Sequence, residues 1–139
     1  AVGDNKTRLK IQREGLHSTL TPVSIVHPSA VISPTGKLGL GTVIFANAVV
    51  NANAVVGEAC IINTAASVDH DCVLGDGVHI SPGSLLAGDV AIGHCSWLGI
   101  GSSVIQCTNI GENVVVGAGA AVVSDLPDGV TAKGVPARF

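Results

Sequence analysis

A histidine between two aspartates, Asp69-His70-Asp71, is the clearest candidate for acid–base chemistry in the sequence. The ordinary pKa of histidine lies near neutral pH, so its imidazole can take a proton from a nucleophile as that nucleophile attacks. A carboxylate held against the ring would fix its tautomer and stabilise the protonated form. The pattern therefore indicates a general base with an acidic partner. On its own it equally fits a surface histidine in a solvated acidic corner.

A strict six-residue repeat surrounds this histidine and must position it. Stepping by six from Val26 to Val122 meets only Val, Ile or Leu, without insertion or deletion. The 17 positions are Val26, Ile32, Leu38, Ile44, Val50, Val56, Ile62, Val68, Leu74, Ile80, Leu86, Ile92, Leu98, Val104, Ile110, Val116 and Val122. Four residues after each of the first 16 comes a small side chain, most often Ala, Ser, Thr, Val or Cys. Neither a helix, with period 3.6, nor a simple strand, with period 2, explains a period of six.

Hexapeptide repeats of this kind predict a parallel β-helix, in which each hexad supplies a short strand and a corner. The aliphatic residue points inward and the small residue fills the corner beside it. Cys60 and Cys72 occupy the small position, so we expect buried, inert thiols. His70 falls between inward Val68 and Cys72, on an outward corner facing any groove beside the coil.

A second period of 18 residues predicts the shape of the coil. Five glycines share it: Gly39, Gly57, Gly75, Gly93 and Gly111. Three hexads per triangular coil would stack these glycines in one column. We expect them to adopt corner dihedrals that other residues avoid.

The composition excludes two classes of protein. The chain is 47% hydrophobic, but its two uncharged stretches long enough to cross a bilayer, 38–57 and 90–111, are interrupted by Asn, Gly, Ser, Thr or His. A net charge of −3 without a basic face argues against a nucleic-acid partner. The N-terminus lacks the apolar region of a signal peptide, and the four cysteines form no dense framework. We therefore predict a cytoplasmic protein with no membrane partner.

The N-terminal residues differ from the rest in charge. Residues 1–16 carry six of the 17 charged side chains. Asp4 can cap a helix over Asn5–Glu14, with Gly15 as its stop. This helix has few apolar positions, so we expect it to pack on another part of the protein. No Met is present, which suggests that part of a longer polypeptide precedes Ala1.

The hexads resemble those of the left-handed β-helix acyltransferases. The stretch 61–89, IINTAASVDHDCVLGDGVHISPGSLLAGD, resembles the sialic acid/bacillosamine-type sugar O/N-acetyltransferases. The opening AVGDN resembles the end of that family's N-terminal nucleotide-sugar domain, and the closing GVPAR is similar to the tail of the wider superfamily. The resemblance implies an all-β fold: a left-handed parallel β-helix of hexapeptide repeats with a short N-terminal helix. It divides the chain into 1–17, a remnant of an N-terminal nucleotide-sugar domain; 18–124, the acetyltransferase β-helix; and 125–139, a C-terminal tail.

The same resemblance assigns roles to individual residues. It makes His70 the general base and Asp71 its acidic partner, with Asp69 a weaker alternative. His79 matches a second active-site histidine that contacts the acetyl group. Gly88 matches a glycine whose backbone N–H approaches the thioester oxygen, where it would stabilise developing negative charge. Asn63 either orders the substrate pocket or forms part of an asparagine ladder.

The implied cofactor is acetyl-CoA, with no metal. In the superfamily the prisms form trimers and the cofactor lies between neighbours, so we expect a homotrimer with active sites between subunits. His79 and Gly88 would then contact cofactor as well as substrate. Gly117 and Ala118 would offer open backbone to pantetheine. Lys133 and Arg138 lie where the superfamily approaches the nucleotide end of the cofactor.

The implied reaction is acetyl transfer to the amino group of a nucleotide-linked amino sugar, with a 4-amino sugar favoured. One alternative is O-acetylation of sialic acid. Another is a carbonic anhydrase-like metal enzyme, which needs three converging histidines. His70, His79 and His94 are 9 and 15 residues apart and lack the close pair typical of that class. A non-catalytic trimeric scaffold is the last alternative.

Overall fold

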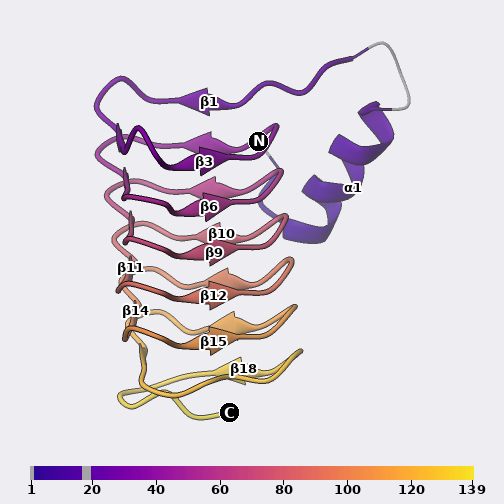
Figure 1. The fold of residues 1–139 in the computed structure, drawn as a ribbon. Coiled ribbons are helices and arrows are strands. Elements are labelled where there is room, and N and C mark those ends of the chain that lie inside the picture. Colours follow the sequence, from indigo (N-terminus) through magenta and orange to yellow (C-terminus); the bar gives the residue numbers. More distant parts are fainter. Residues whose placement is uncertain (1, 17–19) are drawn as a thin grey trace.

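The computed structural model describes residues 2–16 and 20–139 and shows one helix beside a tall stack of coils (Figure 1). The helix is α1 (Asn5–Leu16), and every strand in the described residues is two residues long. The strands are β1 (Ile25–Val26), β2 (Val31–Ile32), β3 (Lys37–Leu38), β4 (Val43–Ile44), β5 (Val49–Val50), β6 (Val55–Val56), β7 (Ile61–Ile62), β8 (Ser67–Val68), β9 (Val73–Leu74), β10 (His79–Ile80), β11 (Leu85–Leu86), β12 (Ala91–Ile92), β13 (Trp97–Leu98), β14 (Ser103–Val104), β15 (Asn109–Ile110), β16 (Val115–Val116), β17 (Ala121–Val122) and β18 (Thr131–Ala132).

The strands form three parallel sheets, as the period of 18 predicts. Each strand from β1 to β14 pairs with the strand three places further along the chain. Residues one coil apart therefore face each other, as His79 and Trp97 do. We call the sheets A (β1, β4, β7, β10, β13, β16, β18), B (β2, β5, β8, β11, β14, β17) and C (β3, β6, β9, β12, β15). The chain turns from sheet to sheet at three edges of a triangular prism. These are the AB edge (for example 63–66), the BC edge (69–72 and 87–90) and the CA edge (75–78).

The core is the column of inward aliphatic residues that the hexads predict. Twelve of the most buried side chains are Val, Ile or Leu, and they lie between the three sheets. Val26 remains 42% exposed because no further coil among the described residues covers the first turn. Cys60 and Cys72 are buried, as predicted, and burial raises the pKa of the Cys60 thiol to about 12.

Between Gly41 and Gly119 each corner contains one residue with left-handed backbone, and these residues recur every six positions. The predicted glycine column does not supply them: Gly39, Gly57, Gly75, Gly93 and Gly111 are absent from the positive-φ residues, so that prediction is wrong. Those glycines are required for close stacking instead. A Cβ on Gly93 would stand 2.6 Å from the carbonyl carbon of Gly111 in the next coil.

Helix α1 begins as predicted but ends two residues later. The Thr7 N–H donates to Asp4 Oδ1 at 2.8 Å, which is the expected N-cap. The helix continues through Gly15 to Leu16 because α1 packs on the coils, so its end does not depend on local propensity alone.

The contacts of α1 follow the CA edge. Asn5 Nδ2 donates to the carbonyl of Cys95, Arg8 donates to the carbonyls of Ala59 and Gly77, and Gln12 Nε2 donates to the carbonyl of Leu40. Four successive coils therefore offer corner carbonyls to one face of the helix, which lies alongside them in Figure 1. The expectation that the helix packs on another element is confirmed.

The C-terminal residues continue the stack. Leu126 is buried and forms a parallel bridge with Ile110, and β18 pairs with β16. Lys133 then forms an antiparallel bridge with Arg138, which folds the chain end back on the last coil. Among the described residues, no helix has the length and apolar character needed to cross a membrane.

Candidate active site

His70 and Asp71 form a hydrogen-bonded pair on the BC edge. His70 Nδ1 lies 2.8 Å from Asp71 Oδ2. Because a carboxylate accepts and does not donate, Nδ1 carries the proton and Nε2 is the free basic nitrogen. The hydrogen bond to Asp71 raises the pKa of His70, and the same bond lowers the pKa of Asp71. Asp71 adopts φ 60°, a conformation that aspartate tolerates better than most residues.

Two asparagines from the preceding coil hold the carboxylates on either side of His70. Asn53 Nδ2 donates to Asp71 Oδ1 at 3.1 Å, and Asn51 Nδ2 donates to Asp69 Oδ1 at 2.9 Å. Asp69 Oδ1 also accepts the backbone N–H of His70 at 2.7 Å. Asp69 therefore fastens the backbone, while Asp71 holds the imidazole. Sequence reasoning missed both asparagines, although Asn51-Ala52-Asn53 lies one 18-residue coil before Asp69-His70-Asp71.

Gly88 lies directly beneath the imidazole of His70. A Cβ at position 88 would stand 2.5 Å from both Cε1 and Nε2 of that ring. In the part of the chain that the structure describes, no acceptor takes the Gly88 N–H. The preceding residue explains this, because the side chain of Ala87 has no acceptor atom, whereas the side chain of Asp69 at the matching position accepts the N–H of His70. The edge thus presents a basic nitrogen beside an open N–H donor.

A second cluster lies on the outer face of sheet A. Asn63 Nδ2 lies 3.2 Å from His79 Nε2, and the rings of His79 and Trp97 stack with centroids 5.9 Å apart. Trp97 Nε1 donates to Ser81 Oγ at 2.7 Å. Burial lowers the pKa of His79 to about 4, so the ring is neutral at physiological pH. Trp97 and Ser81 were missed by sequence reasoning; the 18-residue step from His79 to Trp97 is the signal that points to them.

The tautomer of His79 follows from its neighbours. Asn63 Oδ1 already accepts the N–H of Thr64 at 2.8 Å, so the amide nitrogen faces His79 Nε2. Nε2 is therefore an acceptor, and the neutral ring carries its proton on Nδ1. His79 Nδ1 is buried and has no partner among the described residues. A buried donor without an acceptor is unfavourable, so the Nδ1–H of His79 is an unsatisfied group in this structure.

A shallow groove of about 290 Å³ continues from this cluster toward the C-terminus. Its lining residues are Ser81, Pro82, Trp97, Gly99, Ile100, Val115, Val116, Gly117 and Ala118. The side chain of Lys133 packs beside Gly117, with its Cγ 3.0 Å from where a Cβ would stand. Arg138 pairs with Lys133 through the backbone. The structure therefore brings together the four residues Gly117, Ala118, Lys133 and Arg138.

The two clusters are not brought together within one chain. His70, Asp71 and Gly88 occupy the BC edge, and sheet A, with His79, is the side of the triangular prism opposite that edge. Asn63 is on the AB edge, next to His79. Each copy of the chain therefore carries two separate halves of the predicted set of site residues.

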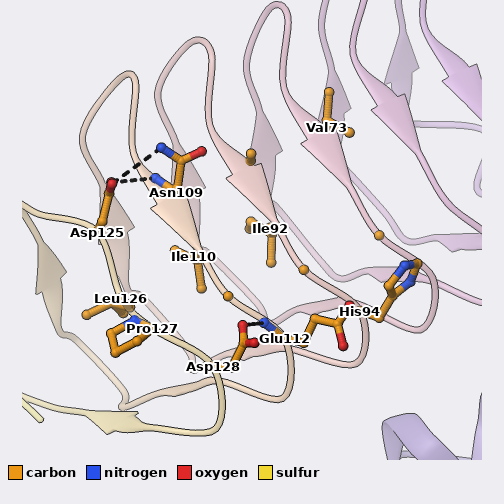
Figure 2. Close-up of a pocket in the computed structure, with 14 residues that line it drawn as sticks. Val73, Ile92, His94, Asn109, Ile110, Glu112, Asp125, Leu126, Pro127 and Asp128 are labelled. Atoms are coloured by element: carbon orange, nitrogen blue, oxygen red, sulfur yellow. Dashed lines mark hydrogen bonds between the residues drawn. The ribbon is translucent and has the colours of Figure 1, made fainter.

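A wider hollow lies elsewhere, on sheet C. It measures about 740 Å³ and runs from Val73 to Asp128 (Figure 2). Asp125 Oδ1 accepts the N–H of Asn109, and Asp128 Oδ1 accepts the N–H of Glu112, both at 2.7 Å. These donors are satisfied internally, and none of the predicted site residues lines this hollow. Across residues 2–16 and 20–139, no group of three or more His, Cys, Asp or Glu side chains could hold a metal ion.

Solved structures resemble the chain over almost its whole length. No protein-family model matches it, and no curated protein matches it. The acetyltransferase domain of PglB from Neisseria gonorrhoeae FA1090 matches with a TM-score of 0.98 and 44% identity over 99% of this chain and 67% of that one. PerB from Caulobacter crescentus, in complex with CoA and GDP-perosamine, matches with a TM-score of 0.98 and 47% identity, with the same coverage. WeeI from Acinetobacter baumannii AYE matches with a TM-score of 0.95 and 27% identity over 99% of this chain and 68% of that one.

The chain is a prism of hexapeptide repeats with a histidine–carboxylate pair on one edge, and its fold matches these structures. The protein is therefore a left-handed β-helix of the acyltransferase class. The chain belongs to the hexapeptide-repeat sugar N-acetyltransferases. The predicted fold, family and enzyme class are thereby confirmed. The chain spans about two thirds of the length of the relatives it matches.

Proposed function

We propose that this protein transfers the acetyl group of acetyl-CoA to the amino group of a nucleotide-linked amino sugar, with a 4-amino sugar favoured. The observation that carries the proposal is the arrangement of His70, whose Nδ1 is held by Asp71 while Nε2 lies against Gly88, a residue whose N–H has no acceptor among the described residues. PerB, a relative with 47% identity, was solved with CoA and GDP-perosamine. A histidine-to-alanine variant of GDP-perosamine N-acetyl transferase was solved with the same two ligands.

The chemistry of the site follows from its donors and acceptors. His70 Nε2 takes a proton from the amine as the amine nitrogen attacks the thioester carbonyl carbon. The Gly88 N–H donates to the carbonyl oxygen as negative charge develops there. The carbon–sulfur bond breaks, and the protonated His70 returns its proton to the departing thiolate of CoA. Asp71 keeps the imidazole in one tautomer and stabilises its charged form throughout.

Residues on sheet A would hold the acyl donor. His79 Nδ1 is a buried donor without a partner, and the backbone N–H of Ala118 has no acceptor among the described residues, so both fit a ligand with carbonyl oxygens. The groove beside Trp97 and Gly117 has the open, narrow form that suits pantetheine. Lys133 and Arg138 lie at its far end, where cations suit the phosphates of acetyl-CoA. Acetyl-CoA supplies the activated acyl group, and no metal takes part.

We propose that a homotrimer completes the site. The BC edge of one copy, with His70 and Gly88, would dock against sheet A of the next copy, with His79. A cyclic trimer uses both surfaces of every copy and yields three sites between subunits. A cytoplasmic location goes with this proposal, and the four cysteines of the chain are all free, as expected for a reducing compartment.

The role of His70 is tested by His70→Ala. Thiol release from acetyl-CoA is measured with a panel of nucleotide-linked amino sugars and sialic acids as acceptors. We expect turnover of a nucleotide-linked 4-amino sugar, and a loss in the variant of about 100-fold or more, which is typical for removal of a general base. Unchanged turnover in His70→Ala would refute the assignment. Preferential turnover of a sialic acid hydroxyl would refute the choice of acceptor.

The shared site is tested by mixing two inactive variants, His70→Ala and His79→Ala. If sites form between copies, random mixed trimers contain some sites with an intact edge from one variant and an intact sheet A from the other. Activity should return to roughly a quarter of wild type after mixing, unfolding and refolding together. No recovery in mixed trimers that form normally would show that each site lies within one copy.

A further inference from the structure

Asn53 is the one side chain from another coil that hydrogen-bonds to the carboxylate of Asp71 in the described structure. Its Nδ2 donates to Asp71 Oδ1 at 3.1 Å, while Asp71 Oδ2 accepts from His70 Nδ1 at 2.8 Å. The two oxygens of Asp71 are therefore each held by a different residue. Asn53 precedes Asp71 by one coil, and the two residues have nearly the same left-handed φ, 59° and 60°. Their side chains stack because their backbones repeat.

The pair of His70 and Asp71 needs such support because it is open to water. The two side chains are 59% and 51% exposed. An exposed ion pair or hydrogen bond between two mobile side chains is weak, because each partner can turn toward solvent. An amide donated from a neighbouring coil restrains the carboxylate without adding charge. The same coil also fastens the backbone of His70, since Asn51 binds Asp69 and Asp69 accepts the His70 N–H.

We propose that Asn53 is a positioning residue for His70: its side-chain amide holds the Asp71 carboxylate in the orientation that accepts the Nδ1–H of His70. The inference rests on the proposed function of His70 as the general base. Asn53 does not touch the reacting atoms, and it acts through Asp71 alone. The active edge then contains an Asn53–Asp71–His70 chain that spans two coils.

The charges around His70 make a neutral donor at position 53 important. The carboxylates of Asp69, Asp71 and Asp89 face this part of the edge, and all three favour the protonated form of His70. A fourth carboxylate at position 53 would repel Asp71 and could not donate to it. A glycine at position 53 would keep the left-handed backbone but leave Asp71 Oδ1 to solvent. The glycine substitution therefore tests the orientation of the Asp71 carboxylate alone, and the aspartate substitution adds a negative charge beside it.

The test uses Asn53→Gly and Asn53→Asp, both compatible with positive φ, and Asn113→Gly as the matched control. Asn113 has φ 56° on the CA edge, away from His70, so it reports what the same backbone change does elsewhere. Two quantities are measured: the pKa of His70 by NMR titration, and kcat with KM for acetyl-CoA. The titration follows the imidazole directly and does not depend on turnover.

We expect kcat to fall about tenfold in both Asn53 variants while KM for acetyl-CoA stays unchanged. The pKa of His70 should move in opposite directions. It should fall toward 6.5 in Asn53→Gly, because the hydrogen bond to Asp71 is formed less of the time, and rise in Asn53→Asp, because negative charge is added. Asn113→Gly should change neither quantity.

A wild-type kcat and His70 pKa in a folded Asn53→Gly would overturn the inference. If Asn53→Gly does not fold, Asn53→Asp decides, since a wild-type kcat in that variant excludes a positioning role. The proposed function can fail separately. If the His70 pKa changes in the Asn53 variants but His70→Ala remains active, Asn53 does position His70, and the assignment of His70 as the general base is wrong.

Discussion

The imidazole of His70 occupies the space that any side chain at Gly88 would need. Cε1 and Nε2 of the ring lie 2.5 Å from the place where a Cβ would stand, closer than real Cβ contacts allow. Gly88 is one coil beyond His70, and its backbone φ is not in the left-handed region. The glycine therefore serves the position of the ring and not the shape of the corner.

Gly88→Ala should displace the ring and reduce activity with little loss of stability. A shift of about 1 Å in a catalytic group can cost about 100-fold in rate, so we expect kcat to fall by that order. Thermal unfolding should change little, because the exposed imidazole can swing outward. Gly15→Ala is the control, since nothing lies within 4 Å of a Cβ there. A fully active Gly88→Ala would contradict the placement of His70 over this residue.

The pH dependence of activity should reflect the raised pKa of His70. A general base must be neutral, so kcat/KM should rise with pH through a midpoint above 6.5, the ordinary value for histidine. Asp71→Asn keeps the left-handed backbone but removes the carboxylate. The midpoint should then move down toward 6.5, and the maximal rate should fall at least about tenfold because the tautomer is no longer fixed. A midpoint unchanged by Asp71→Asn would contradict the pairing.

His79 should make the stability of the fold fall as the pH is lowered from 6.5 toward 4. Its folded-state pKa is about 4 and its ordinary value is 6.5, so between these values the unfolded chain binds a proton that the folded chain rejects. Stability from the neutral ring is complete above pH 6.5 and is lost as the pH falls toward 4. We expect Tm to drop by a few degrees between pH 7.5 and pH 5. His79→Gln, which cannot titrate, should lose less over that range; an equal loss would show that other groups are responsible.

Two glycine substitutions should separate close stacking from backbone conformation. A Cβ on Gly93 would meet backbone atoms of Gly111 and Glu112 at 2.6 Å, which cannot move aside cheaply. Gly93→Ala should destabilise the fold by about 3 kcal/mol or more. Gly101 has φ 64° and open space around it, so Gly101→Ala should cost only about 1 kcal/mol. Urea unfolding measures both; equal costs would mean that stacking is not the constraint.

Much of the fold was predictable because the hexads directly encode strand, corner and inward side chain. The left-handed β-helix, its aliphatic core and the N-cap of α1 follow from the residue pattern and the resemblance. The spacing of the glycines correctly predicts that they stack in one column, but it does not show whether glycine is needed there for an unusual φ or for close contact. Gly93 shows the difference only when the next coil is in place.

From the residues alone, the site was predictable only where it is local in sequence; Gly88, Asn63 and His79 were named from the family resemblance. His70 and Asp71 are neighbours in the chain, so their pairing could be anticipated. Asn53 acts on Asp71 from a different coil, and Trp97 acts on His79 in the same way. Such contacts become visible once the 18-residue register is known. The separation of His70 from His79 depends on the triangular cross-section, which places an edge opposite a face.

Helix α1 changes how the stack of coils can come apart. In a solenoid each coil contacts only its neighbours, so the ends fray one coil at a time. Asn5, Arg8 and Gln12 bind carbonyls on four successive coils, from Cys95 back to Leu40, and so join non-adjacent coils directly. The coils beside the helix therefore open together as one cooperative unit, and that unit includes the coil with His70. The BC edge that carries His70 therefore lies in coils that do not fray individually from the ends of the stack.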